Sequence, residues 1–260
     1  MITVYYAVDS LGKFELGNET FQETLNEIMI ESLVSVYLDL KKHENKNKKD
    51  NIFACKSFLQ YTKNMYLMKN PFDLDIRIEK NQVLNFGNKK LNNMLQTRLL
   101  QVENVYNFNY TPSYIFFSEE SLEMEILSPF MHKNTFCKNG YIYPGVFNIN
   151  GWFRPVNASL QFYDNTDKTI VSLKGDPLMY IRFLTDEPVK LKRFAINQEL
   201  KDIMSTTTIY KRYDPNRSLN YLYDKFTKSG LQKKTLKLIK ENLIWRRLYI
   251  SAIIRYSHKG

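Results

Sequence analysis

The stretch that decides the fold is ASLQFYDNTDKTIVSLKGDPLMYIRF, residues 158–183. In its first part, residues 158–163, apolar and polar side chains alternate with the period of two that is typical of a strand with one buried face. A polar turn leads to the apolar residues 169–173, and Lys174-Gly-Asp-Pro177 then turns the chain into residues 178–183. Three short strands separated by turn residues predict an antiparallel sheet.

Short apolar segments separated by polar turns continue on both sides of this stretch, from residue 113 to about 193. We expect further strands at 114–117, 122–127, 141–149 and 151–154, and towards the N-terminus at 2–8, 64–69 and 74–79. Segment 114–127 is typical of a hairpin, because the polar residues 118–121 separate its two apolar runs. Strands and turns at this spacing predict an α+β fold whose core is an antiparallel sandwich or a barrel-like sheet.

Residues 21–42 predict an N-terminal helix. Thr20 and Glu23 have the spacing of a capping box, which satisfies backbone donors where a helix begins. Apolar side chains then recur at steps of three and four, as in an amphipathic helix. The polar run 43–50 that follows predicts an exposed loop.

The last third of the chain is also predicted to be helical. Ser229 and Gln232 form a second candidate capping box, and an apolar stripe at helical spacing follows it. We therefore divide the chain into a strand-rich core domain, residues 1–196, which includes the N-terminal strand and helix, and a basic helical C-terminal segment, residues 197–260.

The composition is that of a globular protein. Hydrophobic residues make up 43% of the 260 residues and aromatic residues 14%, which is ample for a core. The two cysteines, Cys55 and Cys137, lack CxxC spacing; one disulfide is compatible with the sequence, but two lone thiols favour a reducing compartment. The N-terminus has no basic lead-in typical of a signal peptide, and no apolar run has the length of a membrane helix. We expect an intracellular, cytoplasmic protein of unknown oligomeric state.

The net charge of +10 is concentrated near the C-terminus. Residues 228–260 contain nine Lys or Arg and one acid, Glu241, so this segment carries +8 of the total. Such an excess predicts a surface that binds a polyanion, most readily nucleic acid. The residues expected to bind are Lys233, Lys234, Lys237, Lys240, Arg246 and Arg247. An acidic protein, an anionic membrane surface and a merely solvated basic face are the alternatives.

A second candidate site combines arginines with aromatic side chains in the strand-rich region. Guanidinium groups beside aromatic rings suit anionic or planar ligands such as nucleotides. The residues of this possible ligand pocket are Trp152, Arg154, Asp176, Tyr180 and Arg182. The alternative is that the rings belong to the core and the arginines extend to water.

Catalytic and metal signatures are weak. Neither GxxxxGK[ST] nor GxGxxG occurs. His132 and Cys137 lie five residues apart, but a zinc site needs three or four ligands in short paired spacings. A Cys-His nucleophilic pair is formally possible, although free cysteines are more often small buried hydrophobes. The sequence therefore predicts no metal, leaves any cofactor unknown, and leaves the question of an enzyme open.

Several short motifs carry a resemblance to a known group of proteins. They are Phe53-Ala-Cys55, Lys63-Asn-Met-Tyr66, Asn70-Pro-Phe-Asp-Leu74, Gly151-Trp152 with Pro155, and Lys174-Gly-Asp-Pro-Leu-Met-Tyr180. With them, residues 50–195 resemble uncharacterised proteins encoded by T4-like marine bacteriophages and some bacteria. The resemblance implies a viral, phage context and brings no assigned activity. The order of strand, Gly-Asp-Pro and strand is also similar to the β-clip sheet of dUTPase-like nucleotide hydrolases, which bears on the fold and not on activity.

Three hypotheses for the function follow. The leading one is a phage accessory protein that binds nucleic acid or another polyanion through its basic C-terminal helix. The second is an enzyme that acts on a nucleotide or other anionic small molecule at the arginine-containing pocket. The third is a virion or interaction component without catalysis, whose aromatic surface meets partner subunits.

Overall fold

The chain folds into several open sheets with helices on two sides. The computed structural model describes residues 1–8, 33–42, 52–70, 73–79, 82–85, 95–96, 107–110, 114–132, 135–163, 168–213 and 216–244. Within these residues the sheets are antiparallel except for one strand pair. The predicted α+β class with an antiparallel, strand-rich core is confirmed, and the sheets are open.

The largest sheet has five antiparallel strands. In spatial order they are β11 (Gly145–Asn148), β9 (Glu123–Leu127), β14 (Pro177–Phe183), β3 (Met65–Lys69) and β2 (Leu33–Ser35). Strand β14 lies at the centre, and Tyr180 on it is opposite Leu127 on one side and Leu67 on the other. The apolar run that ends the stretch 158–183 is therefore buried in the middle of a sheet.

The N-terminal strand is the middle of a second sheet. Strand β1 (Ile2–Val8) pairs in parallel with β15 (Val189–Arg193) and antiparallel with β8 (Tyr114–Ser118). Its side chains alternate between two buried clusters: Val4, Tyr6 and Val8 contribute to one and Tyr5 and Ala7 to the other. Strand β1 is thus covered on both faces.

Two smaller sheets complete the strand-rich part. One has the order β10 (Gly140–Ile142), β12 (Ala158–Phe162), β7 (Asn107–Tyr110) and β6 (Leu95–Gln96). The other has the order β13 (Lys168–Ser172), β4 (Leu74–Glu79) and β5 (Gln82–Asn85). The three strands of the stretch 158–183, β12, β13 and β14, therefore belong to three different sheets.

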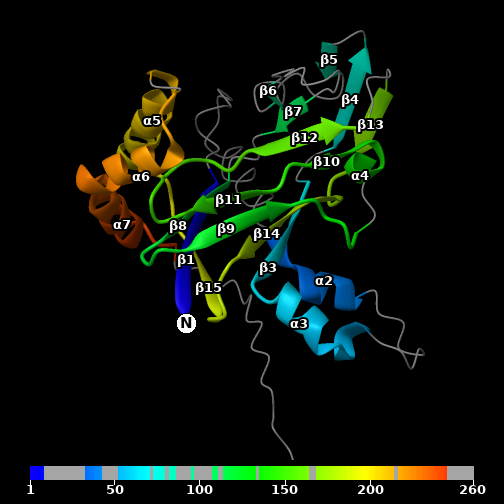
Figure 1. The fold of residues 1–260 in the computed structure, drawn as a ribbon, viewed down its shortest axis with the longest axis horizontal. Coiled ribbons are helices and arrows are strands. Elements are labelled where there is room, and N and C mark those ends of the chain that lie inside the picture. Colours follow the sequence, from blue (N-terminus) through cyan, green and yellow to red (C-terminus); the bar gives the residue numbers. More distant parts are fainter. Residues whose placement is uncertain are drawn as a thin grey trace, which may run out of the picture.

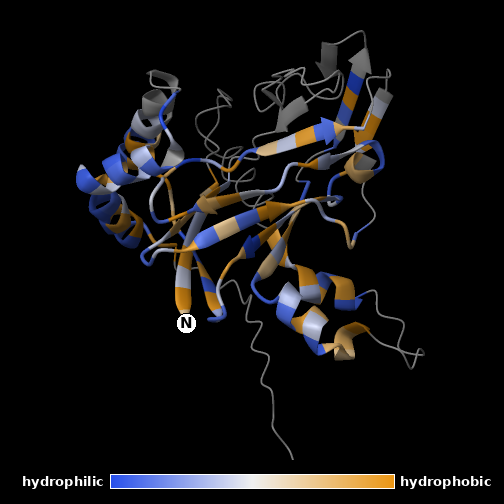
Figure 2. Cartoon of the chain, in the orientation of Figure 1, coloured by the Kyte–Doolittle hydropathy of each residue, from blue (hydrophilic) through white to orange (hydrophobic). Residues whose placement is uncertain are grey.

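Helices lie on two sides of the strands. Near β3 are α2 (Val36–Lys42), the 3-10 turn η1 (Ile52–Ala54) and α3 (Lys56–Thr62), and the short α4 (Thr135–Asn139) precedes β10. The C-terminal helices are α5 (Gln198–Tyr213), α6 (Leu219–Lys228) and α7 (Leu231–Glu241), which gather beside β1 and β8 (Figure 1). Helices α6 and α7 carry both hydrophilic and hydrophobic residues, as expected for helices with one buried face (Figure 2).

Two predictions about the strands are wrong. Segment 114–127 is not a hairpin, because β8 pairs with β1 whereas β9 pairs with β11 and β14. Residues 151–154 are not a strand; a bend at Gly151 is followed by irregular backbone that brings Trp152 against α6. In both segments the sequence pattern correctly indicated apolar residues. Tertiary packing decided which strands pair and whether the segment forms a strand at all.

Two predictions about the helices also need correction. Within the expected helix 21–42, the structure shows a strand over Leu33–Ser35 and a helix over Val36–Lys42. Residues 21–32 and the expected loop 43–50 lie outside the described part of the chain. Ser229 does not cap α7: it ends α6 and donates its hydroxyl to Phe226 O (2.9 Å). Gly230 occupies the N-cap with φ +79°, a left-handed conformation that suits glycine in the tight turn between α6 and α7.

The C-terminal helices share a hydrophobic cluster with the sheet they cover. From the strands and the segment after Gly151 come Tyr5, Ala7, Ile115, Phe117, Trp152 and Phe153; from the helices come Leu200, Ile203, Met204, Leu222, Phe226, Leu238 and Ile239. The end of α7 is also fixed by backbone hydrogen bonds from Ala195 N to Asn242 O (2.9 Å) and from Ile244 N to Arg193 O (3.0 Å). The helical segment beyond residue 197 is therefore packed on the strand-rich part.

Candidate functional site

Four of the six residues predicted to bind a polyanion lie on α7. Lys233, Lys237 and Lys240 follow one another at steps of four and three, so they project from one side of the helix. Together with Leu236 and Glu241 they line an open groove of about 420 Å³, which we call the α7 lysine groove. Arg246 and Arg247 lie outside the described residues, because the described chain ends at residue 244.

Acidic side chains lie near these lysines. Lys240 Nζ is 2.7 Å from Glu119 Oε2, while Lys237 is 3.9 Å from Glu241 and Lys234 is 3.9 Å from Glu199. The hydrogen bond to Glu119 raises the pKa of the Lys240 ammonium group above its usual value. All these side chains are largely exposed, so the pairs are screened by water and exchange readily. The positive charge of α7 is compensated in part.

The five residues of the predicted ligand pocket do not lie together. Trp152 belongs to the cluster under the C-terminal helices. Tyr180 belongs to a different cluster, beside α2. Asp176 lies in the turn before β14, where its carboxylate accepts a hydrogen bond from Leu173 N (2.9 Å) and stabilises the turn. The hypothesis of an enzyme with all these side chains around one pocket therefore has no geometric basis.

Arg154 lies over aromatic rings at the junction of β11 and α6. Its guanidinium carbon is 5.8 Å from the ring centre of Phe147 and 5.9 Å from that of Trp152. Burial lowers the pKa of the Arg154 guanidinium below its usual value, and electrostatic interaction with Tyr223 acts in the opposite direction. Arginine nevertheless stays charged in proteins. This arrangement is a cation held against π faces.

Tyr180 is part of a buried polar network that links four segments of the chain: α2, β3, residues 131–132 and β14. His132 Nδ1 lies 2.6 Å from Tyr180 Oη, and His132 Nε2 lies 3.3 Å from Asp39 Oδ2. Lys69 donates to the other carboxylate oxygen of Asp39 at 2.8 Å. Tyr180 Oη also accepts from Met131 N (3.1 Å), so its own hydrogen is available to donate to Nδ1 of the histidine. The network orders α2 against the five-stranded sheet.

Arg182 lies in a polar cleft at the end of β14. Its guanidinium pairs with Glu125 (2.7 Å) and covers the ring of Tyr61 at 4.7 Å. The cleft, about 280 Å³ in volume, is completed by Gln60, Lys63 and the segment from Phe183 to Asp186. Because Arg182 already has a carboxylate partner, this cleft offers little net charge to an anionic ligand.

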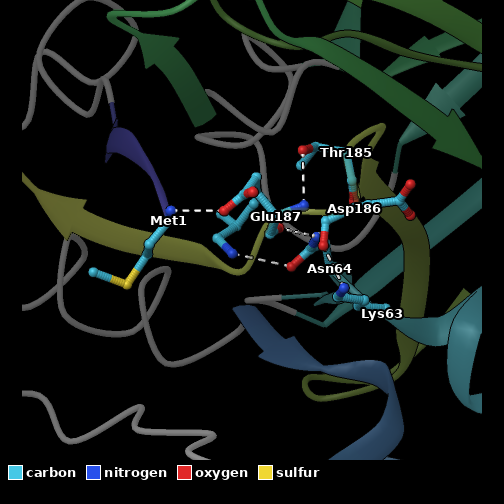
Figure 3. Close-up of polar contacts among 7 residues, drawn as sticks. Met1, Lys63, Asn64, Thr185, Asp186 and Glu187 are labelled. Carbon is cyan, nitrogen blue, oxygen red and sulfur yellow. Dashed lines mark hydrogen bonds and ion pairs between the residues drawn. The ribbon is translucent and has the colours of Figure 1, made fainter.

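Asn64 fixes the loop next to this cleft. Its amide nitrogen donates to Thr185 O (3.0 Å) and Glu187 O (2.8 Å), and its amide oxygen accepts from Val189 N (3.1 Å) (Figure 3). Asn64 has φ +56°, a left-handed conformation that asparagine tolerates better than most residues. These contacts hold the loop between β14 and β15, whose Glu187 pairs with the N-terminal ammonium group at 2.8 Å.

The sequence did not indicate several residues of these sites. Asp39 and Lys69 lie 30 residues apart and meet only through the fold. Phe147 and Tyr223, which surround Arg154, carried no local signal either, because aromatic residues are common throughout this chain. The one useful signal in the sequence was the combination of arginine and aromatic residues at 152–154, which indicated the site around Arg154.

Metal-ligand clusters and disulfides are absent from the part of the chain that the structure describes. No group of three His, Cys, Asp or Glu side chains there has the arrangement of a metal site. Cys55 and Cys137 are both free thiols. Burial raises the pKa of the Cys137 thiol, which disfavours the reactive thiolate.

Comparison of the chain with models of protein families, with curated proteins and with solved structures finds no match. Among the described residues, no helix is long and apolar enough to span a membrane. The class of molecule defined so far is an α+β protein with open antiparallel sheets, a basic C-terminal helix and a half-buried arginine held against aromatic rings.

Proposed function

We propose that this protein binds a polyanion, and specifically the phosphate backbone of nucleic acid, through the α7 lysine groove. The observation that supports the proposal is that Lys233, Lys237 and Lys240 line one open groove. The opposite side of α7 is anchored by Leu238 and Ile239, which are buried under the helix. A basic helix fixed in this way presents its lysines together without a cost for ordering the backbone at binding.

The spacing of the lysines is compatible with a phosphate chain. From Lys233 to Lys240 the helix rises about 10 Å, at 1.5 Å per residue. Successive phosphates of one strand are about 3.4 Å apart along the axis, so the groove spans about three of them. Contacts of this kind neutralise phosphates and read no base sequence.

The nearby carboxylates weaken this interaction without removing it. Glu119 and Glu241 must give up their exposed lysine partners when a phosphate binds, and the repulsion between carboxylate and phosphate lowers the affinity. The sequence that follows α7 compensates, because residues 245–260 contain four basic residues and no acid. We therefore expect modest, strongly salt-dependent affinity.

The test is fluorescence anisotropy of a labelled double-stranded DNA oligonucleotide over a range of salt concentrations. The triple variant K233Q/K237Q/K240Q should bind more weakly and reduce the slope of log affinity against log salt by about 3, at about 0.9 per lost phosphate contact. A matched control, K56Q/K174Q/K190Q, removes three exposed lysines elsewhere and should leave the slope nearly unchanged. Equal binding by both triple variants, or binding that ignores salt, would contradict the proposal.

The biological setting is a proposal of its own. We infer from the sequence resemblance that this is a phage-encoded accessory protein that works in the host-cell cytoplasm. An alternative role as a virion component without catalysis is distinguished by mass spectrometry of purified phage particles. Stoichiometric presence in particles favours the virion component, and absence favours the cytoplasmic accessory protein.

A further inference from the structure

Arg154 is a charge that the described part of the protein leaves without a counter-ion. Its contacts there are the ring faces of Phe147 and Trp152 and an electrostatic interaction with Tyr223. No carboxylate of the described residues pairs with it. Arg182, another arginine held over an aromatic ring, differs in this respect, because Glu125 lies 2.7 Å from its guanidinium.

An unpaired guanidinium in a mostly buried place is unfavourable. Removing a charge from water is costly unless an opposite charge or hydrogen bonds replace the lost hydration. Cation–π contacts recover only a part of this loss. The five N–H donors of Arg154 therefore retain capacity for an acceptor that approaches from the side still open to solvent, since the side chain is partly exposed.

A second donor, this one buried, lies on the same segment of the chain. Trp152 is 4% exposed, and its indole Nε1–H has no hydrogen-bond partner within the described residues. Buried donors in native proteins are nearly always satisfied, and an unsatisfied one calls for an explanation such as a bound ion or ligand. Two donors without acceptors thus occur two residues apart on one short segment.

This segment is held firmly in place. Asn148 Oδ1 accepts hydrogen bonds from Asn150 N (2.9 Å) and Gly151 N (3.0 Å), which fixes the turn that leads into Trp152. A side chain at Gly151 would contact the ring of Tyr223 at 3.2 Å, so the backbone and α6 are already close. The donors are therefore preorganised, which lowers the entropic cost of binding.

We propose that Arg154 anchors a binding site for a small oxyanion, a phosphate or carboxylate group, beside the rings of Phe147 and Trp152. The planar guanidinium matches the two oxygen atoms of either group in a bidentate pair. The site is separate from the α7 lysine groove in its residues, and it does not depend on nucleic-acid binding. The ligand is a small molecule that carries such a group.

Trp152 provides a direct optical probe. The chain contains two tryptophans, so the variant W245F leaves Trp152 as the single tryptophan reporter. In this background we titrate inorganic phosphate and, separately, acetate at constant ionic strength and follow tryptophan emission. We expect a saturable change with at least one of the two anions at millimolar concentration, the range of weak single-site binding.

The variants assign the response to Arg154. R154Q should abolish the emission change, and R154K, which keeps the charge but loses the planar pair of donors, should weaken it about tenfold or more. The matched control is R217Q, because Arg217 also lies over an aromatic ring, that of Tyr221 at 4.8 Å, but is exposed on the surface. R217Q should respond as W245F does.

A second measurement protects the test against a variant that folds poorly. The anion should raise the thermal midpoint of the wild-type protein and leave that of R154K less changed, because a ligand stabilises only the state that binds it. A response to phosphate identifies a phosphate group as the ligand, and one to acetate identifies a carboxylate. No saturable response to either anion, or a response in R154Q equal to that of W245F, would overturn the proposal.

Discussion

Asp39 is a carboxylate that the fold keeps charged although it is buried. Burial would raise its pKa, but the hydrogen bond and charge of Lys69, with the charges of His132 and Lys42, lower the pKa below its usual value of 3.8. The ion-pair partner Lys69 is itself 25% exposed, so the interaction is strong but not fully shielded from water. Asp39 therefore ties α2 to β3 in a pH-dependent way.

Replacing Asp39 by Asn should destabilise the protein by about 3 kcal/mol, the lower end of the range for breaking a buried pair. Because the folded-state pKa of Asp39 is lowered, its contribution is fully present above about pH 4 and is lost as the pH falls below that value. The measurement is the free energy of unfolding in urea for wild type and D39N at pH 7 and pH 3. The difference between them should be smaller at pH 3.

The control for this prediction is D224N. Asp224 pairs with Lys228 at 3.3 Å on the exposed side of α6, where an ion pair contributes little. A loss of stability in D39N no larger than in D224N would show that the Asp39 network does not stabilise the fold.

At the scale of elements, two threonines in the C-terminal helices differ in whether the hydroxyl group has a hydrogen-bond partner. Thr207 on α5 and Thr235 on α7 are both fully buried. Thr207 Oγ1 has two carbonyl acceptors within hydrogen-bond distance, Met204 O (2.7 Å) on its own helix and Phe153 O (2.9 Å), and the second links α5 to the segment after Trp152. Thr235 Oγ1 has no hydrogen-bond partner within the described residues. The first hydroxyl joins two elements, and the second is a buried polar group in an apolar interface.

Valine has nearly the shape of threonine, so T235V should remove only the unsatisfied hydroxyl and stabilise the protein by about 1 kcal/mol. T207V should destabilise it by a similar amount, because Phe153 O loses its donor. Thermal unfolding of both variants, followed by circular dichroism, decides between the outcomes. If both substitutions changed the stability in the same direction, the presence of a hydrogen-bond partner would not determine how each hydroxyl affects stability.

The elements themselves could largely be predicted from local patterns, but their partners could not. Alternation and turn residues located β1, β3, β4 and β14 within a residue or two. The apolar spacing in 33–42 fitted a helix and yet includes a strand, because Leu33 and Val34 complete the edge of the sheet against β3. Short apolar segments fit either structure, and tertiary packing decides between them.

For the candidate sites too, the sequence identified some of the residues but not which of them lie together. Residue composition identified the lysines of α7 and the pair Trp152 and Arg154. It grouped Tyr180 with Arg154, although the two belong to separate clusters. Nothing local could relate Asp39 to His132, because a contact between residues so distant in sequence exists only in the folded chain.

At the scale of the whole molecule, the C-terminal helices and the sheet of β1 form one packed unit. The cluster between them contains residues from β1, β8, the segment 152–153 and all three C-terminal helices. The boundary at residue 197 that the sequence predicts therefore falls between two parts that share a hydrophobic cluster. Parts of a chain that share a buried interface of this kind depend on each other for stability.

A chain truncated to residues 1–197 should lose its cooperative unfolding transition and bind a hydrophobic dye, because Tyr5, Phe117 and Phe153 would be uncovered. Calorimetry and dye fluorescence measure both effects. The control, residues 1–244, keeps every contact described above and should still unfold cooperatively. A cooperative transition of the 1–197 chain at the wild-type midpoint would establish the helices as a separate domain.

The sequence by itself determined the α+β class, most of the strands and the concentration of positive charge near the C-terminus. These properties follow from side-chain periodicity and composition, which act over a few residues. The tertiary structure decided which strands pair, which lysines of α7 meet Glu119 and Glu199, and that Arg154 is enclosed by rings without a carboxylate in the described chain. Those outcomes depend on contacts between residues far apart in sequence, and only the burial of one common core brings such residues together.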